Sequence, residues 1–165
     1  MKKEKEQYKK LIRSIIVILL VACETIIFMH YWINIYNKYT VFPFFQKGHW
    51  MMAAMYIIYQ IIFLYIFGGL KVGYLKKANI IFSQVLAMLG SNVIIYLQIV
   101  LLSVRFVNIV PMMKATLVDI CVVVIVAIIS ESIFRKLFPP RELIVLYEDY
   151  DPDEFIKKID RKSVV

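Results

Sequence analysis

Cysteine and histidine are scarce in this chain, which has two of each among its 165 residues. Cys23 and Cys121 lie inside apolar runs, and neither His30 nor His49 has a cysteine or histidine close by in sequence. Protein zinc sites need several such ligands at characteristic short spacings. The pattern argues against a metal site, and both cysteines are interpreted as small apolar residues.

Glycine is also scarce, with five residues in all. None lies in the acidic stretch YEDYDPDE (147–154), which follows the apolar run ELIVLY (142–147). A turn that holds a dinucleotide pyrophosphate needs glycines for close approach of the backbone, and acidic side chains repel the phosphates. We therefore expect no nucleotide or other cofactor in this chain. No phosphate-binding loop, nucleophile–base pair or paired-carboxylate pocket can be recognised, so no catalytic residue is predicted.

Long apolar runs dominate what is present. The chain is 61% hydrophobic with a mean hydropathy of +0.72, whereas soluble domains are about 45–50% apolar. Four runs are long enough to cross the roughly 30 Å of bilayer hydrocarbon, and only helices can satisfy the backbone there. The sequence predicts an all-α membrane domain over 12–138, with helices at about 12–34, 50–68, 79–103 and 112–134.

Basic residues outnumber acidic ones by 20 to 12, for a formal net charge of +8. They lie between the apolar runs and form no amphipathic patch, so nucleic acid is not an expected partner. Twelve of them fall in 1–13, 71–77 and 135–141, and four fall on the other side of the predicted spans. Because cytoplasmic loops carry the excess of Lys and Arg, both termini, including the basic segment 1–11, are predicted to be cytoplasmic.

The last segment, 139–165, has a different pattern. Pro139 and Pro140 end the fourth predicted helix, and 142–147 has the size of a buried strand. Asp151 is a good N-cap for a following helix, with Pro152 at its first position. One strand and one helix cannot form a stable domain alone, so the sequence predicts a single incomplete β-α unit of a Rossmann-like domain.

Two acidic residues interrupt the apolar runs, Glu24 and Asp119. An ionisable residue within a span is a functional hypothesis by default, here proton coupling or contact with a lipid headgroup. The alternative is an acid that faces the bundle and is neutral, or paired with Lys114 or Arg105.

Uncharged polar residues Gln84, Ser91 and Gln98 recur every seven residues in the third run. They predict either the lining of a lipid or substrate site, or ordinary helix packing with hydrogen bonds between helices. Lys71, Lys76 and Lys77 are candidates for contact with a lipid phosphate, or they determine topology only.

The whole arrangement resembles the N-terminal region of bacterial polyprenyl glycosylphosphotransferases, the sugar transferases that begin exopolysaccharide, capsule and O-antigen units. The residues that carry the resemblance are GGLKVGYLKKANIIFSQVLAMLGSNVIIYLQIVLL (68–102) and LFPPRELIVLYED (137–149). In that family a separate C-terminal domain holds the catalytic acids and Mg²⁺, and it is missing here. The resemblance therefore assigns a catalytic role to no position of this sequence. The chain is expected to be inactive alone, and to be a truncated reading frame or a fragment.

The resemblance implies a membrane anchor in the bacterial cytoplasmic membrane for an enzyme that moves sugar-1-phosphate from a UDP-sugar to undecaprenyl phosphate. Membrane lipid, undecaprenyl phosphate, polysaccharide-assembly proteins and a second copy of the chain are the partners expected. Two other interpretations stay open. One is a small four-helix proton-coupled transporter that uses Glu24, and the other is a stand-alone accessory membrane protein.

Overall fold

The computed structural model describes residues 2–71 and 77–137. This part of the chain folds into four α-helices and one short 3-10 helix, and it contains no strand. The elements in chain order are α1 (Lys2–Asn34), η1 (Tyr36–Tyr39), α2 (Lys47–Ile66), α3 (Lys77–Ser103) and α4 (Val110–Leu137).

Each of the four predicted spans is confirmed as a helix long and apolar enough to cross a membrane. The candidate spans are Gln7–Asn34, Lys47–Ile66, Ala78–Ser103 and Val110–Phe134. The largest difference is at the start, because α1 begins at Lys2 and not near residue 12. The Lys- and Glu-rich segment before the apolar run consists of good helix formers, so the helix extends through it. The predicted β-α unit over 139–165 lies outside the described residues.

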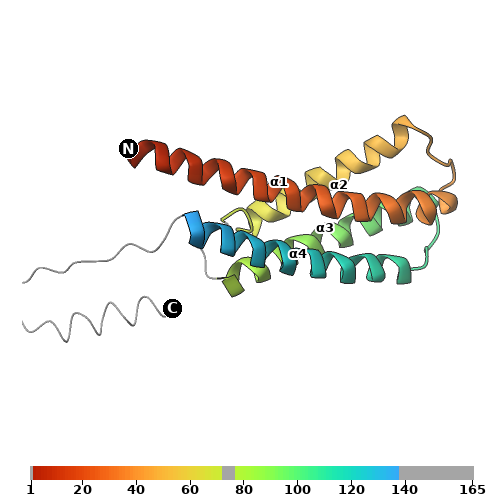
Figure 1. The fold of residues 1–165 in the computed structure, drawn as a ribbon. Coiled ribbons are helices and arrows are strands. Elements are labelled where there is room, and N and C mark those ends of the chain that lie inside the picture. Colours follow the sequence, from red (N-terminus) through yellow and green to blue (C-terminus); the bar gives the residue numbers. More distant parts are fainter. Residues whose placement is uncertain (1, 72–76, 138–165) are drawn as a thin grey trace, which may run out of the picture.

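The helices form an up-down-up-down bundle. α1 packs against α2 and α4, and α3 packs against the same two helices. Figure 1 shows that the start of α1 and the end of α4 lie at one end of the bundle, together with the end of α2 and the start of α3. We call this the terminal end; the end with the connections 35–46 and 104–109 is the loop end.

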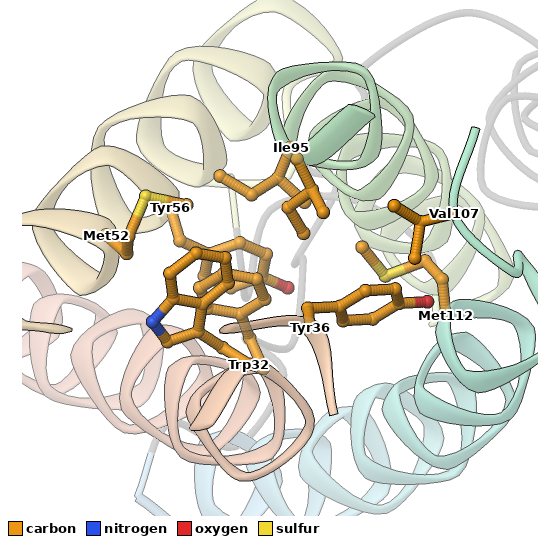
Figure 2. Packing of buried hydrophobic residues seen from close by; sticks show 9 residues of the cluster. Trp32, Tyr36, Met52, Tyr56, Ile95, Val107 and Met112 are labelled. Carbon is orange, nitrogen blue, oxygen red and sulfur yellow. The ribbon is translucent and has the colours of Figure 1, made fainter. Parts of the chain in front are cut away.

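An aromatic cluster fills the bundle interior toward the loop end. Its buried members come from α1, η1, α2, α3, the second connection and α4: Phe28, Trp32, Tyr36, Met52, Tyr56, Ile95, Ile99, Val107 and Met112. In Figure 2 the rings of Trp32, Tyr36 and Tyr56 lie together between the helices. The Trp32 indole N–H donates to Nδ1 of His49 at 3.1 Å, and the Tyr36 hydroxyl donates to the Asn108 carbonyl at 3.2 Å. These bonds satisfy the polar atoms that such large side chains bring inside.

A second, aliphatic cluster fills the interior toward the terminal end. It is built from Ile16, Leu20, Ile80, Val123, Val126 and Phe134. A smaller cluster of Val21, Leu64 and Ala87 lies beside it. Close packing of α2 and α3 here depends on Gly90, because a Cβ at that position would lie 2.8 Å from the ring of Phe63.

The outward faces of the helices are apolar. Large exposed side chains include Ile18 and Ile26 on α1, Leu101 on α3 and Leu117 on α4, each more than 60% exposed. A face of this kind is stable when lipid chains cover it. The fold is therefore that of a multi-pass membrane protein.

Candidate functional site

A layer of polar side chains separates the aromatic cluster from the aliphatic cluster. Glu24 projects into this layer from α1 and is fully buried. Its Oε2 accepts a hydrogen bond from the side-chain amide of Gln60 on α2, which is also fully buried. A buried carboxyl group in an apolar bundle needs such a donor, since burial without a partner is costly.

Asp119 enters the same layer from α4, with 1% of its surface exposed. Its Oδ2 accepts a hydrogen bond from Nδ2 of Asn92 on α3, at 3.2 Å. The same amide nitrogen lies 3.0 Å from the hydroxyl of Thr116, one turn earlier on α4. On its other side, Asn92 Oδ1 accepts from the Tyr56 hydroxyl at 3.1 Å. Asn92 thus connects α2, α3 and α4.

The layer includes a side chain from each of the four helices. Tyr56 and Gln60 are one turn apart on α2, so they lie on the same face of that helix. Glu24 and Asp119 are near enough to interact electrostatically. Measured from the loop end, all five residues lie about 14–20 Å along their helices at 1.5 Å per residue. With the loop end of the helices at the edge of roughly 30 Å of hydrocarbon, this depth would be close to the middle.

Three oxygen atoms in the layer have no hydrogen-bond donor. They are Oε1 of Glu24, Oε1 of Gln60 and Oδ1 of Asp119. All three are acceptors in their usual states. The described part of the chain provides no ion pair to either acid. Lys114 and Arg105 are both exposed, and the Arg105 guanidinium lies 5.5 Å from the centre of the Tyr39 ring.

The three polar residues of the seven-residue pattern on α3 lie elsewhere. Gln84 is buried and directs its amide toward the Gly69 carbonyl at 3.4 Å. The Ser91 hydroxyl donates to Ala87 of its own helix at 2.9 Å. Gln98 accepts a bond from the Tyr59 hydroxyl at 3.0 Å. These contacts are side-chain bonds that accompany packing of α3, and they do not bring the three residues to one point.

The basic residues of the 71–77 segment are described in part. Lys71 is exposed, Lys76 lies outside the described residues, and Lys77 is the first residue of α3. A lipid-phosphate contact by these lysines therefore stays a prediction.

Sequence reasoning found both acids but missed Gln60, Asn92 and Tyr56. One signal was available, because Gln60 is the single Gln or Asn within 47–66. An amide alone in an apolar helix is expected to have a partner inside the bundle.

The site offers oxygen ligands and little else. Among residues 2–71 and 77–137, no three His, Cys, Asp or Glu side chains gather as they do in a metal centre. Cys23 is partly buried, Cys121 is exposed, and both are free thiols. The layer can therefore hold protons or a small cation at carboxyl and amide oxygens.

No protein-family model, curated protein or solved structure matches the chain.

Proposed function

We propose that the four-helix bundle is the non-catalytic membrane domain of an initiating sugar transferase. It would hold the cytoplasmic segment that follows α4 at the membrane surface, where sugar-1-phosphate passes from a UDP-sugar to undecaprenyl phosphate. The membrane would be the bacterial cytoplasmic membrane, with both termini in the cytoplasm.

One observation carries this proposal. The basic start of α1 and the end of α4 lie at the same end of the bundle, which is the end that the Lys and Arg distribution assigns to the cytoplasm. Residues that follow α4 would therefore emerge beside the basic N-terminus. Attraction of this basic surface to anionic lipid, about 1 kcal/mol per Lys or Arg, would keep an attached catalytic domain close to its lipid substrate.

A gain-of-function fusion tests the proposal. The full chain is joined after residue 165 to the catalytic domain of a polyprenyl-phosphate sugar-1-phosphate transferase. Washed bacterial membranes are then assayed for transfer of radiolabelled sugar phosphate to undecaprenyl phosphate. The fusion should be active, while the chain alone should give no turnover. A fusion no more active than the catalytic domain without an anchor contradicts the proposal, and so does turnover by the chain alone.

Proton-coupled transport is a second candidate, favoured by the complete burial of Glu24 beside a second acid. An acid in this position can load and release a proton as a pathway opens. The test is pH-driven export of cationic dyes from cells that express the chain. Glu24→Gln should abolish export, while Glu131→Gln, a change on α4 about three turns from Asp119, should leave it intact. Export that persists in Glu24→Gln excludes this function.

A further inference from the structure

The polar layer has more acceptors than its own donors satisfy. Glu24, Gln60 and Asp119 each place one oxygen without a donor in an interior where their exposed fractions are 0%, 0% and 1%. A buried acceptor without a partner costs about 1–3 kcal/mol, and more if it is charged. These three atoms, on three helices and at similar depths, are acceptors that an electron-poor ligand would satisfy.

Each acid of the layer has a single amide donor. Gln60 donates an N–H to one oxygen of Glu24, and Asn92 donates an N–H to one oxygen of Asp119. Each acid therefore has one oxygen with a donor and one without. The described bundle provides no cationic side chain that could balance a carboxylate at either position. Buried charges of this kind are paired or coordinate metal ions.

We propose that Oε1 of Glu24, Oε1 of Gln60 and Oδ1 of Asp119 bind one dehydrated monovalent cation of the Na⁺ class. Carboxylate and amide oxygens are hard ligands, and hard cations prefer them. One bound Na⁺ balances one carboxylate, and a single proton on the other acid makes the layer neutral. The inference rests on neither candidate function, because it concerns only the bundle interior.

Every titratable group that faces the layer is part of this balance. α1 provides Glu24, α2 provides the Tyr56 hydroxyl, α4 provides Asp119, and α3 contributes the neutral Asn92. Without Na⁺ the two acids reach neutrality by holding two protons. Entry of one Na⁺ should therefore release about one proton, and low pH should compete with Na⁺ binding.

The first test is thermal unfolding of the full chain in lipid nanodiscs, in NaCl and in choline chloride at equal ionic strength. Na⁺ should raise the unfolding temperature by about 4 °C when present at roughly ten times its dissociation constant. Glu24→Gln and Asp119→Asn should lose this shift, because each replaces a coordinating carboxylate by an amide of the same shape. Glu131→Gln is the matched acid-to-amide control and should keep it.

A second measurement needs only the wild-type protein, so it decides the question even if the variants fail to fold. Binding of ²²Na⁺ should saturate at about one ion per chain, with release of about one proton detected by a pH indicator in weak buffer. Equal stabilisation by NaCl and choline chloride would overturn the proposal. Absence of ²²Na⁺ binding would also overturn it, and would mean that protons alone occupy the layer.

Discussion

The ring of Tyr56 on α2 lies nearly parallel to the ring of Phe28 on α1, with centroids 4.6 Å apart and planes 6° apart. The hydroxyl of the same tyrosine donates to Asn92 on α3. One side chain therefore belongs both to the aromatic cluster and to the polar layer, and its two contacts can be removed separately.

Tyr56→Phe keeps the ring contact and removes the hydroxyl. Asn92 Oδ1 then loses its donor in a buried site, which should lower the free energy of unfolding by about 1–3 kcal/mol. The measurement is denaturant unfolding in mixed micelles. Tyr59→Phe is the control, because the Tyr59 hydroxyl bonds to the partly buried Gln98. This variant should lower the free energy of unfolding by less than Tyr56→Phe does. Equal losses in the two variants would contradict the role given to Asn92.

Val104→Gly should stabilise the protein. Val104 follows the last residue of α3 with φ at +50°, a left-handed conformation that a β-branched residue adopts at a cost of roughly 1–2 kcal/mol. Its side chain is 80% exposed, so little packing is lost on its removal. We expect a gain of about 1 kcal/mol, measured by thermal unfolding. Val93→Gly, inside α3 and also exposed, should instead lower the free energy of unfolding by roughly 0.5 kcal/mol, because glycine has a lower helix propensity than valine.

Gly90→Val should disrupt the contact between α2 and α3. Even the first added carbon would lie 2.8 Å from the Phe63 ring, so the ring or a helix must shift, at a cost of about 1–3 kcal/mol. The double variant Gly90→Val with Phe63→Ala should recover part of that loss. If the losses of unfolding free energy in the two single variants simply add in the double variant, the two residues are not in the contact described.

Tyr36, in the connection beyond α1, should make stability sensitive to alkaline pH. Burial raises the pKa of its hydroxyl from 10.0 to about 12. The folded protein thus favours the neutral phenol, and the stabilisation is complete below pH 10 and lost as pH rises from 10 through about 12. At 1.36 kcal/mol per pKa unit, the loss amounts to about 2–3 kcal/mol. Tyr36→Phe should show a smaller loss when unfolding is followed between pH 9 and 12. An unchanged slope would contradict this prediction.

The orientation can be tested by labelling single cysteines in intact cells, in a background without Cys23 and Cys121. A cysteine in place of Lys47, at the start of α2 and the loop end, should react with a membrane-impermeant reagent. One in place of Lys76 should react only after the membrane is opened. The reverse pattern would place the termini outside the cytoplasm and would also remove the main support for the proposed anchor.

The helices were predictable because each depends on a local property, the length of an apolar run. The start of α4 was missed by two residues because Pro111 falls in its first turn, where proline is tolerated.

The partners of Glu24 and Asp119 were not predictable. Which residue of α2 or α3 meets an acid depends on how the helices cross and on their relative axial position, and neither can be derived from periodicity. Arg105 illustrates this: it was a candidate partner of Asp119, yet it lies over Tyr39 at the loop end.

The polar layer also has a mechanical consequence. Helices in lipid are held together by side-chain packing and by hydrogen bonds between them. Here a slide of α1 by one turn, about 5.4 Å, would separate Glu24 from Gln60 and place its carboxyl against the aromatic or the aliphatic cluster. The bonds of Glu24 and Asp119 therefore add to side-chain packing in fixing the axial position of each helix relative to the others. Any motion of this bundle should consist of tilting about that level and not of sliding along it.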